Sequence, residues 1–205
     1  MKSKGVQVFG EHELLDRILK GKRHYSHCIS IRSPDQEMPD YLPPAFAEVL
    51  ELKFYDILED SASGRKGPTE DDANRIVEFV TRTRQNATGY TLHCWGGHSR
   101  STAAALAVLY LLLGSEGKAV EQLLKVRPDP RPSPNTTLLR HFDKILGSNL
   151  LPIGQRLQAE FQEQLRTELT ELFPEDGIEE LPVVQDAPGL LARAEHIRAE
   201  KPPTA

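Results

Sequence analysis

Cysteine is scarce in this sequence, which excludes a small fold stabilised by several disulfide bonds. The 205 residues include two cysteines, whereas disulfide scaffolds carry many more. A long apolar run is also missing, since the longest, Ala103 to Leu113, falls far short of the ~20 residues of a membrane-spanning helix. The N-terminus lacks the apolar stretch typical of a signal peptide. We therefore expect a cytoplasmic location, no membrane partner and thiols that stay reduced.

An excess of basic side chains is missing too, which argues against nucleic acid as the main partner. The 25 Lys and Arg residues face 30 Asp and Glu residues, a formal net charge of -5, whereas nucleic-acid-binding domains usually show a basic footprint. The charge is unevenly distributed, because residues 151–205 hold 11 acidic and 5 basic side chains and residues 1–150 hold 19 and 20. This asymmetry suggests a nearly neutral body followed by an acidic extension.

The hydrophobic pattern of the first 150 residues predicts strands that alternate with helices. We expect strands over 5–9, 25–31, 50–55 and 90–93. We expect helices over 11–20, 42–50, 100–113, 120–126 and 136–146, and one that starts after Thr69, with Asp72 completing a capping box. The alternation predicts an α/β fold, with a central sheet flanked by helices.

The pattern changes after Gly147, where the chain turns into an extension. Apolar residues recur there at helical spacing, namely Leu157, Phe161, Leu165, Leu169 and Leu172, and prolines interrupt the sequence beyond them. We expect residues 1–149 to form the main domain and residues 150–205 to form a helical, acidic, partly flexible C-terminal extension. The apolar stripe fits packing against the body or a dimer contact, so the oligomeric state stays open.

One segment of the main domain, residues 92–102, has the residue types of an anion-binding nucleophile. An expected strand leads into Cys94, a loop with Gly97 follows, and Arg100 stands at the first turn of an expected helix. Five intervening residues let the backbone wrap around one tetrahedral anion, with Gly97 helping to turn N–H groups inward. The helix N-terminus and the Arg100 guanidinium add positive charge. These charges favour a Cys94 thiolate, which is a nucleophile for phosphoryl transfer.

The run His93-Cys94-x-x-Gly97-x-x-Arg100-Ser101 resembles the signature loop of cysteine-dependent protein tyrosine and dual-specificity phosphatases. The resemblance covers roughly residues 25–147, and it includes an Arg127-Pro128 … Pro134-Asn135 element before a later helix. It implies a protein tyrosine phosphatase-like fold for the main domain. It also implies phosphomonoester hydrolysis through a phosphocysteine intermediate, without a metal or organic cofactor.

The resemblance also implies a role for each matching residue. Cys94 would carry the phosphoryl group, and Arg100 would bind the substrate and stabilise the transition state. Ser101 would stabilise the leaving thiolate, and His93 would support ionisation of the cysteine. The substrate phosphate would bind to the loop formed by Trp95, Gly96, Gly97, His98, Ser99 and Arg100. His98 stands at a variable position, where an imidazole could contact substrate or respond to pH.

Phosphatases of this kind also need an aspartate as general acid, on a loop upstream of the cysteine. We expect Asp56, which directly follows an expected strand, and keep Asp60 on the same loop as the second candidate. We expect Asn135 to be a helix N-cap rather than a ligand contact.

The sequence leaves the substrate and several alternatives open. Phosphotyrosine on protein is the first expectation, and phosphoserine or phosphothreonine fits the dual-specificity resemblance. An inositol phosphate or phosphoinositide is the next alternative, although the loop has no lysine, and an RNA 5′-triphosphate is a further one. A non-catalytic phospho-binding module and a sulfurtransferase are also conceivable. Cys28, expected as a buried strand residue, could guard Cys94 through a disulfide, whereas the spacing of His93, Cys94 and His98 does not fit zinc.

Overall fold

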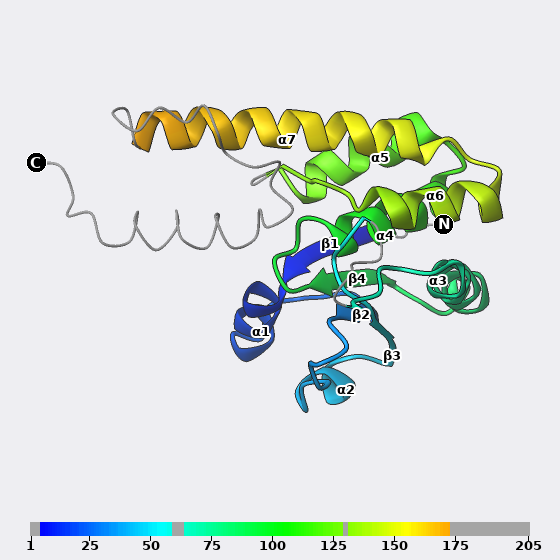
Figure 1. Cartoon of the computed structure of the whole chain (residues 1–205). Helices are drawn as coiled ribbons and strands as arrows, with labels where there is room; N and C mark the ends of the chain where they lie inside the picture. The colour runs from blue at the N-terminus through cyan, green and yellow to red at the C-terminus, as the bar shows by residue number, and fades with distance from the viewer. Residues whose placement is uncertain (1–4, 59–63, 129–130, 173–205) are drawn as a thin grey trace, which may run out of the picture. The chain divides into compact units, whose positions relative to one another are not determined.

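The computed structural model describes residues 5–58, 64–128 and 131–172 (Figure 1). The chain divides into two compact units, residues 1–161 and 162–205, and the site described below lies in the first. The strands are β1 (Gly5–Gly10), β2 (His27–Arg32), β3 (Glu48–Lys53) and β4 (Gly89–Cys94). The helices are α1 (Glu11–Leu19), α2 (Leu42–Ala45), α3 (Glu70–Thr83), α4 (Arg100–Leu113), α5 (Glu116–Val126), α6 (Thr136–Leu146) and α7 (Leu150–Leu172).

The four strands form one parallel sheet in the order β1-β4-β2-β3, which confirms the expected α/β class. Every residue of β2 and of β4 is buried, as is typical of parallel strands covered on both faces. In the register, Gly10 at the end of β1 lies beside Cys94 at the end of β4. The carboxyl ends of all the strands therefore meet at one edge of the sheet.

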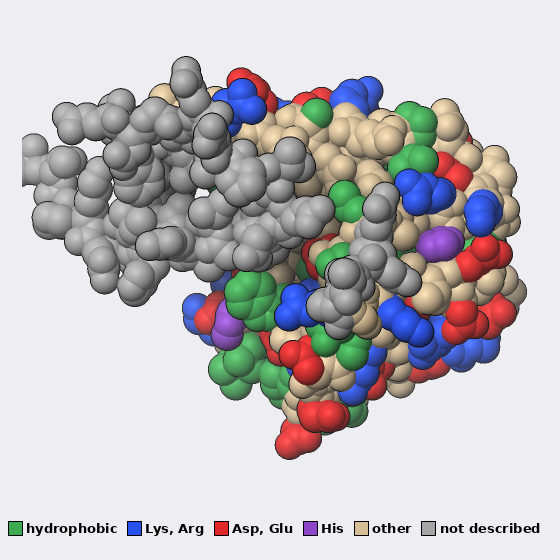
Figure 2. Space-filling view, in the orientation of Figure 1, with side chains coloured by type: hydrophobic (Ala, Val, Ile, Leu, Met, Phe, Trp, Pro, Cys, Tyr) green, Lys and Arg blue, Asp and Glu red, His purple; other side chains and the backbone are tan. Residues whose placement is uncertain are grey.

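The two faces of the sheet are covered by different helices (Figure 1). Helices α3, α4, α5 and α6 and the first turns of α7 build the larger cluster of buried apolar side chains on one face. Helices α1 and α2 cover the other face with a smaller cluster that includes Leu14, Leu42 and Phe46. Charged side chains of both signs are interspersed over the described surface in Figure 2.

The two cysteines lie on opposite faces of this sheet. Cys94 belongs to the larger cluster and Cys28 to the smaller one, and Cys28 is in register with Thr91 rather than with Cys94. A disulfide needs Cβ atoms about 3.5–4.5 Å apart. A redox guard between these two thiols is therefore incompatible with the folded sheet. Burial raises the pKa of the Cys28 thiol far above its ordinary value.

Helix α4 is the central element of the larger cluster and has the bounds expected from the sequence. Residues 103–109 are buried on all sides, and four of these seven are alanines, which let the helix lie close to the sheet. Gly114 ends the helix with φ of 65°, a left-handed conformation that glycine adopts without steric cost.

The expected helix over 42–50 is wrong beyond its first turn. Pro43 and Pro44 fit the first turn of a helix, where an amide N–H is not needed, and α2 ends at Ala45. Phe46 is extended, and β3 begins at Glu48 because Val49 and its neighbours pair with β2. The alternation alone predicts that this strand begins at residue 50. The pairing with β2 makes it begin earlier, at Glu48.

Helix α7 begins inside the main hydrophobic core. Leu150 and Leu157 are buried in the larger cluster, and a Cβ on Gly154 would lie 2.1 Å from a methyl carbon of Leu139 on α6. The helical part of the extension is therefore confirmed, whereas the expected flexible tail lies outside the described residues, as do the side chains of Leu169 and Leu172. Among the described residues, no helix is long and apolar enough to cross a membrane.

Candidate active site

The site lies where the carboxyl ends of the strands meet. Cys94 is the last residue of β4, Ser33 directly follows β2, and Asp56 follows β3 after a short connection. Strand β4 lies between β1 and β2, so the order of the strands in the sheet differs from their order in the chain. Open α/β sheets bind ligands at the carboxyl ends of the strands where the strand order reverses in this way.

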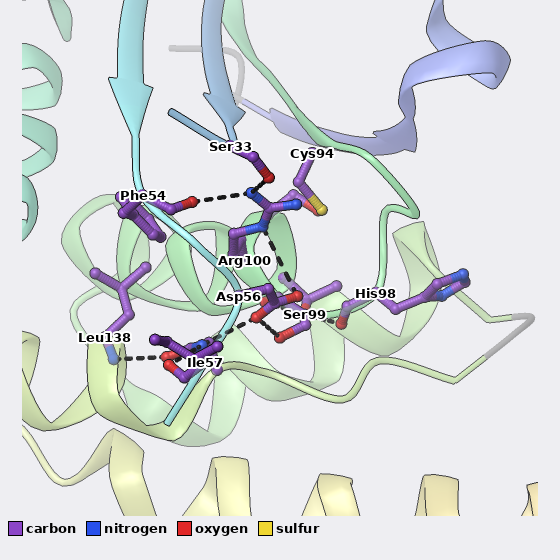
Figure 3. Close-up of polar contacts among 12 residues, drawn as sticks. Ser33, Phe54, Asp56, Ile57, Cys94, His98, Ser99, Arg100 and Leu138 are labelled. Carbon is purple, nitrogen blue, oxygen red and sulfur yellow. Dashed lines mark hydrogen bonds and ion pairs between the residues drawn. The ribbon is translucent and has the colours of Figure 1, made fainter. Parts of the chain in front are cut away.

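The Cys94 sulfur lies at the base of the loop and is in contact with polar hydrogens (Figure 3). The Gly97 N–H donates a hydrogen bond to Sγ at 3.3 Å, and the Ser101 Oγ lies 3.2 Å from the same atom. The residue is only 2% exposed, so a ligand must reach deep into the loop to contact the sulfur. Both groups are able to donate a hydrogen bond to the sulfur.

Gly97 is required at its position for two independent reasons. Its φ of 75° is in the left-handed region, and a Cβ there would lie 2.5 Å from the Gly10 amide nitrogen. The loop therefore closes against the end of β1, and Gly97 has a left-handed backbone conformation in it.

Several carbonyl groups of the loop are held on its outer side. The Trp95 carbonyl accepts a hydrogen bond from the Glu11 N–H at 3.0 Å, and the Gly96 carbonyl accepts one from Arg127 at 3.4 Å. The His98 carbonyl accepts another from the Ser133 N–H at 2.9 Å. Because a trans peptide directs its N–H opposite to its carbonyl, these contacts turn the following N–H groups toward the inside of the loop. The arrangement is a concave set of donors for an anion.

Arg100 is buried at the start of α4 and is fixed by three contacts (Figure 3). One terminal nitrogen donates to the Phe54 carbonyl at 3.0 Å and to Ser33 Oγ at 3.3 Å. Its Nε lies 3.7 Å from a carboxylate oxygen of Asp56. The guanidinium is thus held in place while keeping further N–H groups for an anion.

Asp56 is held close to the loop by two hydrogen bonds to one carboxylate oxygen. Ser99 Oγ donates at 2.7 Å and Asn135 Nδ2 at 3.0 Å (Figure 3). The side chain remains 23% exposed, so it can be reached from solvent. The structure thus brings Asp56 next to Ser99 and Arg100, whereas Asp60 lies outside the described residues.

Asn135 is the residue whose second contact the sequence did not indicate. Its side-chain oxygen accepts from the Leu138 N–H at 3.0 Å, which confirms the expected N-cap of α6. The same side chain donates from its amide to Asp56, and the cap motif alone carries no signal for that contact.

His93 is buried on the face of the sheet opposite to Cys94 and is neutral at pH 7. Burial lowers its pKa from 6.5 to about 4, and the positive charges of Arg32 and Arg100 act in the same direction. A neutral imidazole carries no net charge to attract the thiolate. The role that the resemblance implies for His93 would therefore rest on its polarity rather than on a positive charge.

Two other loop side chains lie at the outer part of the site. The imidazole of His98 points away from the Cys94 sulfur in Figure 3 and stacks on the Phe161 ring of α7, with centroids 6.2 Å apart. The Trp95 side chain is 43% exposed. The loop backbone is therefore the part of this segment that encloses the anion position.

The described part of the chain contains no group of three or more His, Cys, Asp or Glu side chains arranged to hold a metal ion. The polar groups beside the Cys94 sulfur are an N–H and a hydroxyl, and the loop that begins at Cys94 ends at the Arg100 guanidinium. Such groups suit an anion rather than a cation.

The structure thus places a cysteine loop and an arginine at the carboxyl edge of a parallel α/β sheet. Among solved structures, the chain is similar to the dual-specificity phosphatase DUSP15, with a TM-score of 0.51 and 20% identity, over 80% of this chain and 94% of that one. The chain therefore has the fold of this phosphatase, which confirms the expected phosphatase-like fold.

Two further solved structures resemble the chain at lower scores. Tk-PTP in its active form has a TM-score of 0.49 and 17% identity, over 70% of this chain and 91% of that one. Human DUSP28 has a TM-score of 0.45 and 17% identity, over 78% of this chain and 94% of that one. No protein-family model and no curated protein matches the sequence.

Proposed function

We propose that this chain is a cysteine-dependent phosphomonoester hydrolase that acts on phosphotyrosine in proteins. The observation that supports this function best is the environment of the Cys94 sulfur. The sulfur accepts a hydrogen bond from the Gly97 N–H and lies beside Ser101 Oγ. The loop that begins at Cys94 ends at the buried Arg100.

The first chemical step is attack of the Cys94 thiolate on phosphorus. The S–P bond forms while the bond from phosphorus to the leaving oxygen breaks, and Asp56 gives its proton to that oxygen. Arg100 and the loop N–H groups stabilise the negative charge on the equatorial oxygens, which is the main electrostatic contribution expected in phosphoryl transfer.

The second step is hydrolysis of the phosphocysteine. Asp56, now a carboxylate, accepts a proton from water as the water oxygen attacks phosphorus. The S–P bond breaks, inorganic phosphate leaves, and the thiolate of Cys94 is restored. Ser101 Oγ, 3.2 Å from the sulfur, donates a hydrogen bond to the departing thiolate.

The shape of the site favours an aryl phosphate. Cys94 is 2% exposed, so a long, flat phosphotyrosine reaches it more readily than a short phosphoserine does. Large apolar side chains that are exposed stand near both reactive residues in the sequence, namely Trp95 at 43% and Leu58 at 42%. Exposed apolar side chains of this kind can pack against an aromatic ring.

Hydrolysis of p-nitrophenyl phosphate in the presence of a chelator tests the mechanism. We expect turnover that needs no added metal and that Cys94→Ser abolishes. Tight phosphate binding without turnover would instead identify a phospho-binding module, and turnover by the serine variant would place the nucleophile elsewhere.

A substrate panel then tests the specificity. Phosphotyrosine peptides are expected to react faster than phosphoserine or phosphothreonine peptides and faster than inositol phosphates or phosphoinositides. Faster hydrolysis of an inositol phosphate would contradict the proposed substrate class but leave the reaction type unchanged.

A further inference from the structure

The first turns of α7, up to Phe161, contact the parts of the chain that form the site. The Phe161 ring stacks on His98 with an interplanar angle of 26°. One turn before Phe161, Gln158 Nε2 donates to the Pro134 carbonyl at 3.0 Å. Glu160, directly before Phe161, forms an ion pair with Arg131 at 3.0 Å. Helix α7 therefore contacts both the loop and the segment that leads into α6.

The His98 imidazole fills the space between Phe161 and the loop backbone. An ideal Cβ on Gly96 would lie 3.0 Å from Cδ2 of His98, so the ring edge lies close to the backbone at Gly96. Phe161 is 3% exposed, so its ring is enclosed by its neighbours. Movement of this imidazole would therefore disturb Gly96, whose own N–H and that of the adjacent Gly97 belong to the inner side of the loop.

The segment that Gln158 contacts is joined to the same loop. The Ser133 N–H donates to the His98 carbonyl, and the Asn135 N–H donates to the Ser99 carbonyl at 3.3 Å. The loop residue His98 is thus held through its side chain by Phe161 and through its carbonyl by Ser133. These contacts give α7 a direct mechanical connection to the position where an anion would bind.

We propose that Phe161 is a positioning residue of the phosphate loop and acts through the imidazole of His98. The inference rests on the proposed function in that it requires the loop to bind an oxyanion. In this arrangement the C-terminal helix is part of the phosphate-binding unit, because the ring of Phe161 keeps the second half of the loop in its donor geometry. Small misplacements of positioned groups can cost about 10²-fold in rate, so even partial release of the loop is expected to be measurable.

Binding of tungstate, a phosphate-like oxyanion, tests this inference without relying on turnover. Trp95 is the single tryptophan of the chain and belongs to the loop, so its fluorescence reports occupancy directly. We expect Phe161→Ala to raise the Kd for tungstate about tenfold and to lower kcat/KM for p-nitrophenyl phosphate by a similar factor. Phe161→Tyr, which keeps the ring, is expected to restore both values.

Leu157→Ala is the matched control, because Leu157 is buried on the same helix one turn earlier, whereas the ring contact with His98 belongs to Phe161. It is expected to lower the Tm without changing the Kd for tungstate. If it weakens tungstate binding as much as Phe161→Ala does, the role of Phe161 is general packing and the inference is wrong. Phe161→Leu serves the same comparison if the alanine variant does not fold.

A double-mutant cycle tests the route through His98. In the His98→Ala background, Phe161→Ala is expected to cause no further loss of tungstate affinity, whereas additive losses would contradict the route. Tungstate binding without hydrolysis by the unchanged chain would overturn the proposed function alone. Absence of tungstate binding would overturn this inference as well.

Discussion

The residue with the most perturbed environment near the loop is His93. Its folded-state pKa of about 4 lies below the ordinary 6.5, so between these values the unfolded chain binds a proton that the folded chain does not. Stability is therefore full above pH 6.5 and falls as the pH decreases toward 4. The difference corresponds to on the order of 3 kcal/mol.

We expect His93→Asn to remove this dependence on pH. Denaturant unfolding of the original and the variant chain between pH 7 and 4 measures the contribution of His93. The carboxylates that titrate near pH 4 are the same in both chains, so their effect cancels in the comparison. Parallel stability curves for the two chains would mean that folding does not lower the pKa of His93.

Asn135 offers a second test on the scale of single residues. Asn135→Ser keeps a residue that can cap α6 but removes the amide that donates to Asp56. We expect turnover of p-nitrophenyl phosphate to fall about tenfold with little loss of stability, because a general acid contributes about 10²–10⁴ only when it is positioned.

Asp56→Asn is the reference variant for this comparison. It is expected to lower turnover by the whole factor that the general acid contributes. If Asp56→Asn leaves turnover unchanged, Asp56 is not the acid and Asp60 becomes the candidate. In that case the hydrogen bond from Asn135 serves only the local structure.

Which residues could be predicted depends on how far apart they lie in the sequence. Cys94, Gly97 and Arg100 stand within one short run, so local spacing was enough to indicate the loop. The contacts of Ser33 with Arg100 and of Phe161 with His98 join distant segments. No local pattern encodes such contacts, because the register of the sheet and the packing of α7 create them.

At the scale of elements, the best-defined local signal is the start of α3. Thr69 Oγ1 accepts from the Asp72 N–H at 3.2 Å, and the Asp72 carboxylate accepts from the Thr69 N–H at 2.9 Å, which confirms the expected capping box. Thr69→Ala is expected to cost about 1 kcal/mol of unfolding free energy, and Thr69→Ser much less. Equal losses for the two variants in denaturant unfolding would show that the hydroxyl is not what matters.

The elements that the sequence placed well are those with their own end signals. Helices α4 and α6 have the expected bounds, and both end at a glycine in the left-handed conformation, Gly114 and Gly147. The boundary between α2 and β3 was misplaced because pairing with β2, rather than a local signal, determines where the strand begins. Local chemistry thus predicts helix ends better than it predicts strand ends.

At the scale of the whole molecule, α7 decides where the stable body ends. Leu150 and Leu157 are almost fully buried in the larger cluster. Each buried leucine contributes about 1.5–3 kcal/mol. A chain ending at residue 149 is therefore expected to lose several kcal/mol of stability. Calorimetry of this chain beside the full one measures the loss, and equal Tm values would establish residues 1–149 as an independent domain.

The pairing of β1 with β4 has a consequence for how the protein folds. Gln7 and Thr91, on these two neighbouring strands, are separated by 84 positions. Contacts between such distant residues slow folding, because a long segment must close before the pairing is rewarded. Gly97 closes against Gly10 only after β1 has docked, so the loop around Cys94 forms in this late phase. During refolding, thiol reagents should therefore modify Cys94 and Cys28 at different rates only once that phase is complete.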